Sequence, residues 1–188
     1  MGNRQELVLV MGRDLEWRDD MLELGPESIR LVDAAIAYVS DNLQAVPCFA
    51  ACQSPYHGEH TPALGKMMAD YFTDQVERFC LTLEAEAFDS RGEVRATWRY
   101  FLQEGLQRYS KVTIIAADFH IPRLRKIVRQ ECGRVGLAHI KFRPVASPIG
   151  SLGLAKELLK RHVHVYLPPG LGRGLVRVLR TTGMNTSY

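Results

Sequence analysis

Residues 111–123 read KVTIIAADFHIPR, and this stretch decides the fold. Its first seven residues are mostly β-branched or small and apolar, which is typical of a strand buried on both faces. The next six carry Asp118, His120 and Arg123, while Pro122 suits the first turn of a helix. The stretch therefore predicts a buried strand that ends in polar side chains where the next helix begins.

The same alternation of a short apolar run and an amphipathic helix continues along the chain. Besides residues 111–117, strands are expected at residues 7–11, 46–52, 79–83 and 139–145, and helices from Pro26, Thr61-Pro62, Ser90 and Pro122 and over residues 152–166. Strands that alternate with helices form a parallel sheet covered on both faces. We predict a three-layer α/β/α sandwich with a mainly parallel, Rossmann-like sheet, in one domain over residues 1–188, with a basic C-terminal tail at 168–188.

Charge and hydropathy argue against several classes of function. No apolar run reaches the roughly 20 residues of a membrane helix, and the N-terminus lacks a signal peptide, so a cytoplasmic protein is expected. The formal net charge is only +3, and the aromatic residues form no basic stacking platform, so nucleic acid is not expected as a partner. No Asp or Glu follows Glu157, whereas five Lys or Arg do. That C-terminal segment could contact phosphate or an acidic partner.

The four cysteines do not suggest a disulfide framework, because the chain is long and carries no secretion signal. Cys48 and Cys52 are spaced C-x3-C, and His57 and His60 follow as H-x2-H. This spacing resembles a zinc site only loosely, and separate core and loop roles explain the residues equally well. A metal-dependent hydrolase that uses Cys52, His57, His60 or His120 is the weakest of the alternatives.

Parallel α/β sheets bind ligands beyond the carboxyl ends of their strands. The candidate ligand-binding and catalytic residues that this rule selects are Gly12, Arg13, Arg30, Glu84, Ser90, Arg91, Glu93, Asp118, His120 and Arg123. We expect His120 and Glu84 to be catalytic, because an imidazole and a carboxylate can both transfer protons. Arg30 and Arg123 would neutralise a phosphate or carboxylate. The structural alternative is that His120 caps its loop and Arg123 pairs with Asp118.

Two local patterns limit this interpretation. Ser90 and Glu93 fit the capping box S-x-x-E, which would give both a structural role at the start of a helix. Gly12-Arg13-Asp14 contains a single glycine, so neither a dinucleotide fingerprint nor a Walker loop follows the first strand. Arg123 and the backbone N–H groups at the start of its helix could together hold an anion without a glycine-rich loop.

The order of these segments resembles the YdcF/SanA/ElyC-like family, over most of the chain. The matching features are the strand 7–11 with Gly12, Arg30 before Ala34-Ala35, Glu84 six residues ahead of Ser90, the strand and loop 111–123 with His120 and Arg123, and the helix at 155–160. Family members usually carry a glycine-rich turn after the first strand and Ser-Gly-Gly after the second. This chain has Gly12-Arg13 and Cys52-Gln53-Ser54 there, and Ser90-Arg91-Gly92-Glu93 where the family has Thr followed by Glu-Asn.

The resemblance implies a Rossmann-like, YdcF-like cytosolic protein that binds a nucleotide-like or anionic small molecule, with S-adenosylmethionine among the candidates. Whether the protein also acts on its ligand as an enzyme is left open. The alternative function is a non-catalytic regulatory or interaction module that uses the basic segment 158–188 as its contact surface. The sequence specifies neither the substrate nor the oligomeric state.

Overall fold

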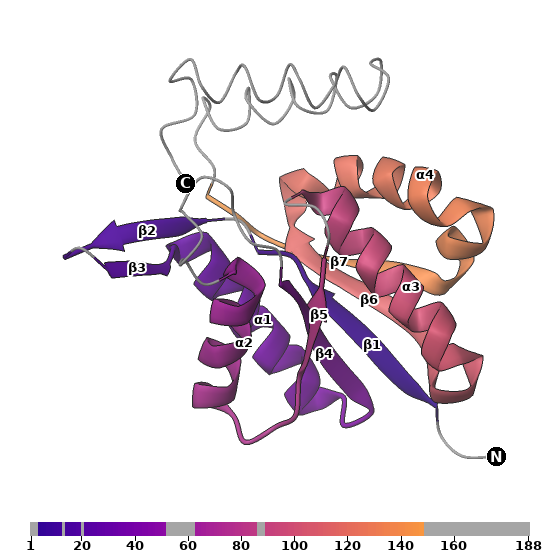
Figure 1. Ribbon diagram of the computed structural model, residues 1–188, viewed down its shortest axis with the longest axis horizontal. Coiled ribbons are helices and arrows are strands. Elements are labelled where there is room, and N and C mark those ends of the chain that lie inside the picture. Colours follow the sequence, from indigo (N-terminus) through magenta and orange to yellow (C-terminus); the bar gives the residue numbers. More distant parts are fainter. Residues whose placement is uncertain (1–3, 13, 20, 52–62, 86–88, 149–188) are drawn as a thin grey trace.

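The computed structural model describes residues 4–12, 14–19, 21–51, 63–85 and 89–148, and its centre is a parallel sheet of five strands (Figure 1). The strands are β1 (Gln5–Val10), β4 (Ala45–Ala51), β5 (Leu81–Glu84), β6 (Tyr109–Ala117) and β7 (Ile140–Val145). They lie in the order β5-β4-β1-β6-β7. The predicted α/β fold with a parallel, Rossmann-like sheet is confirmed.

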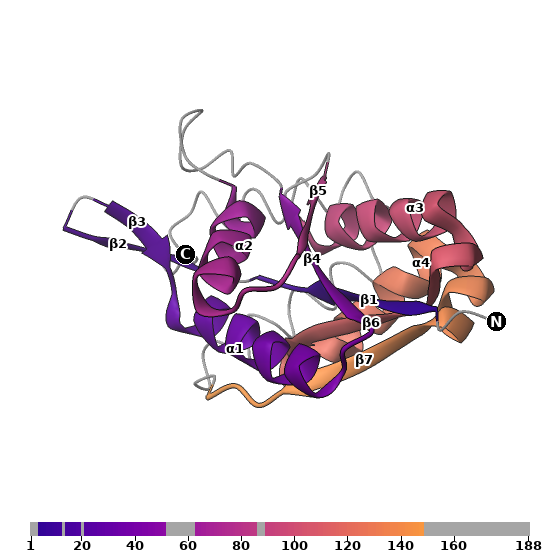
Figure 2. The ribbon, with the colours of Figure 1, turned by 90° about the horizontal axis from the view of Figure 1, so that it is seen from below.

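Helices cover both faces of this sheet, as the views in Figures 1 and 2 show. The helices α1 (Pro26–Asp41) and α2 (Leu64–Gln75) pack on one face, and α3 (Ser90–Arg108) and α4 (Ile121–His139) pack on the other. β1 divides its side chains between the two layers, because successive residues of a strand point to opposite faces. Leu7 and Leu9 belong to the core beneath α3 and α4, while Val8 and Val10 belong to the core beneath α1 and α2.

The sheet has a topological switch point between β1 and β6. From β1 the chain first builds the sheet toward β4 and β5, and it then crosses back to β6 and β7 on the other side. The carboxyl ends of β1 and β6 lie side by side, with Val10 in register with Ile115. In open sheets of this kind the ligand crevice is found at such a point, so the fold places residues after β6 where a ligand is expected.

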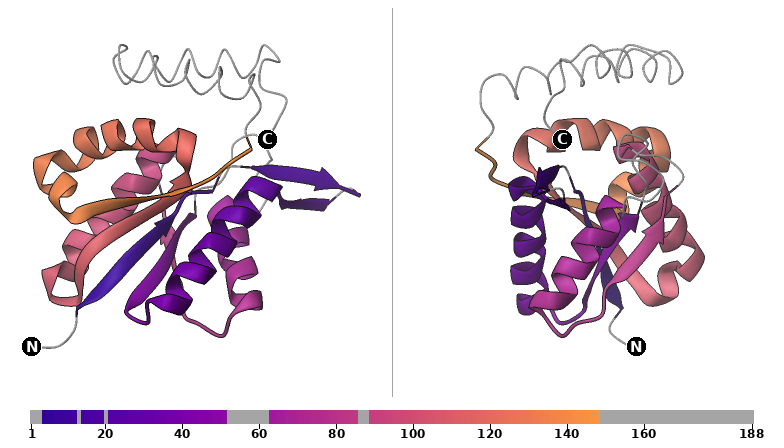
Figure 3. Two further views of the ribbon diagram at one scale, coloured as in Figure 1. Left: turned by 180° about the vertical axis from the view of Figure 1, so that it is seen from behind. Right: turned by 60° about the vertical axis from the view of Figure 1, so that its left-hand side comes forward.

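A two-stranded antiparallel hairpin, which the sequence analysis did not predict, is inserted between β1 and α1. It consists of β2 (Leu15–Arg18) and β3 (Met21–Leu24). Asp19 in its turn has a φ of 47°, a backbone conformation that Asp adopts more readily than most residues. Figure 3, left, shows the hairpin projecting beyond the sheet near the start of α1.

Several boundaries of helices and strands differ from those predicted from the sequence. Phe79 was expected inside the third strand, but β5 begins at Leu81 and the Phe79 side chain is 66% exposed. The helix expected from Pro26 is α1, which ends at Asp41, and Leu43 beyond it is 80% exposed. The expected cap at Thr61-Pro62, the helix at 152–166 and the basic tail at 168–188 lie outside the described residues. No helix of the described part is both long and apolar enough to cross a membrane.

Candidate functional site

Three polar side chains meet at the carboxyl edge of the sheet, beside the amino ends of two helices. Ser90 is the first residue of α3, His120 ends the short 3-10 helix η1 (Asp118–His120), and Arg123 lies in the first turn of α4. The Oγ of Ser90 is 3.3 Å from Nε2 of His120, and Nη2 of Arg123 donates to the same Oγ at 3.3 Å. Arg123 Nη2 also contacts Nε2 of His120. We call these three residues the Ser90 cluster.

The geometry of the Ser90 cluster determines the tautomer of its imidazole. A guanidinium can only donate hydrogen bonds, so His120 Nε2 must accept from Arg123. The ring proton then lies on Nδ1, and the Ser90 hydroxyl, which accepts from Arg123, lies 3.3 Å from Nε2. His120 is 8% exposed, so its ring is held in this position by packing. The imidazole therefore accepts from the guanidinium and holds it beside the Ser90 hydroxyl.

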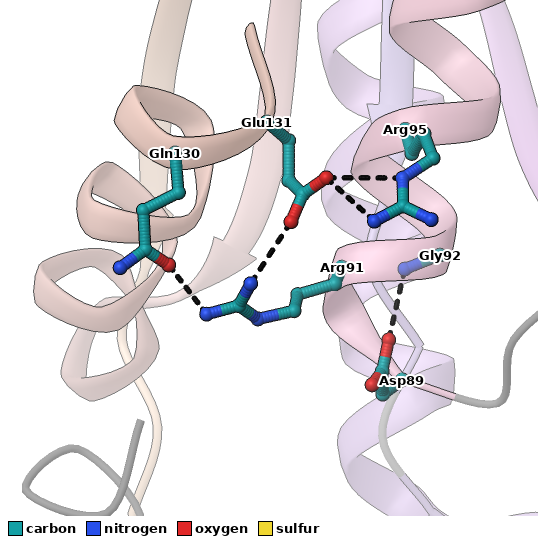
Figure 4. A network of polar contacts seen from close by, with 6 residues as sticks. All are labelled: Asp89, Arg91, Gly92, Arg95, Gln130 and Glu131. Atoms are coloured by element: carbon teal, nitrogen blue, oxygen red, sulfur yellow. Dashed lines mark hydrogen bonds and ion pairs between the residues drawn. The ribbon is translucent and has the colours of Figure 1, made fainter. Parts of the chain in front are cut away.

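Ser90 can take part in this cluster because another residue caps its helix. The Oδ1 of Asp89 accepts a hydrogen bond from the backbone N–H of Gly92 at 2.9 Å, as Figure 4 shows. The predicted capping box, with Ser90 as the cap, is therefore wrong by one residue. Asp89 satisfies the helix end that Ser90 was expected to satisfy, which leaves the Ser90 hydroxyl for His120 and Arg123.

Glu93 lies one helical turn after Ser90 and is electrostatically coupled to the cluster. Burial and the negative charge of Asp89 raise the pKa of its carboxyl to about 8, although the positive charge of Arg123 opposes both effects. Glu93 is thus mostly protonated at neutral pH. A protonated Glu93 does not neutralise Arg123, so the guanidinium keeps its charge available to a ligand.

Arg91, which was expected to bind a ligand, instead joins α3 to α4. Its Nη1 lies 2.9 Å from Oε1 of Glu131, and its Nη2 donates to the side-chain oxygen of Gln130 (Figure 4). Arg95 binds the other oxygen of Glu131 at 2.7 Å. The Arg91 and Glu131 side chains are only 10% and 11% exposed. This ion pair fixes the two helices whose amino ends carry the Ser90 cluster.

Two further candidates lie at the carboxyl edge but away from the cluster. Arg30 lies on α1, across the sheet from α4, and pairs with Glu27 at 3.1 Å. Glu84 is an exposed residue at the end of β5, which is separated from β6 by β4 and β1. The structure brings neither residue into the hydrogen-bonded group around His120.

The remaining candidates have local roles. Gly12 packs so closely against α2 that a Cβ there would lie 2.4 Å from Sδ of Met68. Asp118 is exposed, and its Oδ1 accepts from the backbone N–H of Phe119 at 2.7 Å, so it stabilises its own turn. Arg13 lies outside the described residues.

The amino end of α1, where many doubly wound folds hold a phosphate, is occupied by Asp14 of the same chain. The Asp14 carboxylate accepts from the backbone N–H groups of Ser28 at 2.8 Å and Glu27 at 3.3 Å. Gly25 allows this approach, because a Cβ at that position would lie 2.4 Å from the Asp14 carboxyl carbon. The sequence analysis missed Asp14. The Asp14 carboxylate already binds the N–H groups at the start of α1 that a ligand phosphate would need.

Replacing Asp14 with Ala should lower the free energy of unfolding by about 1–2 kcal/mol, because two N–H groups at the start of α1 lose their acceptor. Urea unfolding followed by circular dichroism measures the change. The control is Asp41→Ala at the opposite end of α1, where we expect a change within about 0.5 kcal/mol. Equal stability of the Asp14 variant and the parent would show that Asp14 is not the cap.

The metal hypothesis gains no support from the described residues, which contain no group of three or more His, Cys, Asp or Glu side chains placed to hold an ion. Burial raises the pKa of the Cys48 thiol, which disfavours the thiolate that a metal needs. Cys52, His57 and His60 lie outside the described residues.

Comparison with known proteins yields no relative: none of the family models, curated proteins or solved structures with which the chain was compared matches it. The geometry of the candidate site favours Ser90, His120 and Arg123.

Proposed function

We propose that the Ser90 cluster binds the phosphate or carboxylate group of an anionic small molecule. The observation that carries this proposal is the convergence of Arg123, Ser90 and His120, from α4, α3 and η1, within hydrogen-bond distance of one another. Two donors, one of them charged, are thereby directed to one place at the edge of the sheet. Of the two residues expected to be catalytic, only His120 belongs to the cluster.

The electrostatic environment favours an anion at this position. α3 starts at Ser90 and α4 starts directly after His120, so the positive ends of two helix dipoles lie beside the cluster. A hydrogen bond from a guanidinium to an anion is about twice as strong as one between neutral groups. Glu93, with its pKa of about 8, does not add a full negative charge at neutral pH.

The ligand that fits these groups carries at least one negative charge. A nucleotide-like ligand supplies it through phosphate, and S-adenosylmethionine supplies it through its carboxylate. Both belong to the ligand class implied by the resemblance to the YdcF/SanA/ElyC-like family, and both would place the anion at the switch point of the sheet.

Replacing Arg123 with Gln should weaken binding of inorganic phosphate by about 10- to 100-fold, because a charge-assisted hydrogen bond contributes about 1.5–3 kcal/mol. Isothermal titration calorimetry measures the affinity, with adenosine monophosphate and S-adenosylmethionine as further probes. The matched control is Arg134→Gln, which removes an exposed cation from the same helix outside the cluster. Its phosphate affinity should stay within about twofold of the parent.

The comparison also tests the position of the site. If Arg134→Gln weakened phosphate binding as much as Arg123→Gln, the effect would be one of net charge and the assignment to the Ser90 cluster would be wrong. The same conclusion follows if the parent protein bound none of the three probes. Thermal unfolding of each variant confirms that the comparison is made between folded proteins.

A further inference from the structure

Although the formal net charge is only +3, acidic and basic residues are unevenly distributed along the chain. Residues 1–90 contain 16 Asp or Glu and 6 Lys or Arg, whereas residues 91–188 contain 5 Asp or Glu and 18 Lys or Arg. A sum over the whole chain gives no reason to expect a polyanionic partner. The distribution of charge along the chain does give such a reason, because a polyanion binds where cations gather on one part of the surface.

The fold turns this separation in sequence into a separation in space. The acidic first half forms β1, the hairpin, α1, β4, α2 and β5, and the basic second half forms α3, β6, α4 and β7, as the colours of Figure 1 show. Residues 121–145, which form α4 and β7, contain seven Lys or Arg and one acidic residue, Glu131. Glu131 is mostly buried and is already bound to Arg91 and Arg95.

Four exposed cations lie on α4 and on β7, the last strand of the sheet among the described residues. They are Arg125 and Arg129 on α4 and Lys141 and Arg143 on β7, and we call them the basic edge. The Arg125 guanidinium lies 5.5 Å from the centre of the Phe142 ring, which places this arginine against β7. Arg129 follows one helical turn later, about 6 Å further along the axis.

The two β7 cations extend the basic edge around the strand. Arg143 lies over the ring of Tyr38 on α1, with its guanidinium carbon 4.7 Å from the ring centre. Lys141 and Arg143 are therefore on the face of the strand opposite to Arg125, because Phe142 lies between them in the sequence. Arg125 and Arg129 therefore lie on one side of β7 and Lys141 and Arg143 on the other, so the four cations flank the edge of the sheet that β7 forms.

The composition of this surface favours nucleic acid over an acidic protein. A protein interface has an apolar or aromatic centre. The large hydrophobic side chains exposed in the described part of the chain are Met21, Leu43, Phe79, Leu102 and Val135. None of them belongs to the basic edge. Contacts to nucleic-acid phosphates need no such centre and are made mostly by Arg and Lys.

We propose that the basic edge binds the phosphate backbone of double-stranded nucleic acid without sequence preference. This proposal is independent of the Ser90 cluster, since no residue is shared between the two. It also revises the expectation from net charge alone, while single-stranded binding by aromatic stacking is still not expected. The basic edge offers Arg and Lys side chains to phosphate groups, so the binding depends on charge and therefore on salt.

The test is fluorescence anisotropy of the full chain with a labelled DNA duplex of about 20 base pairs, at salt concentrations from about 50 to 200 mM. The test variant Arg129→Gln/Lys141→Gln removes two cations of the basic edge for which the structure shows no ion pair among the described residues. The control Arg18→Gln/Lys66→Gln removes two exposed cations from the acidic half and has the same net charge.

The test variant should lose affinity by about tenfold or more at the lowest salt, and the slope of log K against log salt should fall by about 2. The control should keep the parent's slope. Three results would overturn the proposal: no binding by the parent at about 50 mM salt, equal losses in both variants, or displacement of the duplex by polyglutamate as efficiently as by unlabelled duplex. Matching thermal unfolding curves for the two variants ensure that folding does not cause the difference.

Discussion

Replacing Glu131 with Ala should lower the free energy of unfolding by about 3–5 kcal/mol, because the buried Arg91 guanidinium would lose its carboxylate. Arg95 would lose its ion pair as well, although that side chain is more exposed and contributes less. Gln130 alone cannot replace a charged partner. The measurement is urea unfolding with a linear extrapolation to water.

The control for this prediction is Glu104→Ala, which removes an exposed carboxylate on α3 that pairs with Arg108 at 3.5 Å. Its effect should not exceed about 0.5 kcal/mol. A second variant, Arg91→Leu/Glu131→Leu, should recover part of the lost stability, because the buried guanidinium of Arg91 is removed together with its carboxylate. If Glu131→Ala unfolded at the same urea concentration as the control, the ion pair would not join the helices as described.

The variant Glu93→Gln should become progressively more stable than the parent as the pH rises from about 5 to 8. The folded pKa of Glu93 is about 8, above the ordinary value of 4.5, so the folded state keeps a proton that the unfolded state has lost over this range. Stability falls with pH wherever the folded state binds more protons. Gln cannot ionise, so the variant avoids this loss.

One pKa unit corresponds to about 1.4 kcal/mol, so the advantage of Glu93→Gln at pH 9 over that at pH 5 should lie between about 2 and 5 kcal/mol. It should level off above pH 8, where the parent's Glu93 is ionised in both states. Thermal and urea unfolding across this pH range give the curve, and Glu104→Gln supplies an exposed carboxylate on the same helix as a reference. A constant difference between Glu93→Gln and the parent at all pH values would show that Glu93 has no raised pKa.

The sheet and its helices could be predicted because their signals are local. The β-branched run from Val112 to Ile115 is buried in β6, and Pro26 stands at the start of α1 as expected. The hairpin could not be predicted, because its four-residue strands are too short for a periodic pattern and its turn lacks glycine. The third strand was placed two residues too early. Arg78 binds the carbonyl oxygens of Leu43 and Ala45, so the chain is held outside the sheet until Leu81.

The candidate site was predicted from the rule that parallel sheets bind ligands beyond the carboxyl ends of their strands, and this rule locates a site only in part. That rule identifies an edge of the sheet, and His120 and Arg123 do lie there beside each other. It does not specify the face, so Arg30 was grouped with residues that lie across the sheet from it. Ser90 was selected correctly but assigned a capping role that belongs to Asp89. Asp89 directly precedes Ser90, so the sequence offered two adjacent residues able to cap.

The anion site is tested most directly by nitrogen-15 NMR of the His120 ring nitrogens while inorganic phosphate is added. We predict that Nδ1 carries the proton in the free protein, that both ring signals shift saturably with phosphate, and that Arg123→Gln abolishes the shift while Arg134→Gln preserves it. A proton on Nε2 in the free protein, or ring signals that do not respond to phosphate, would contradict an anion site formed by Ser90, His120 and Arg123.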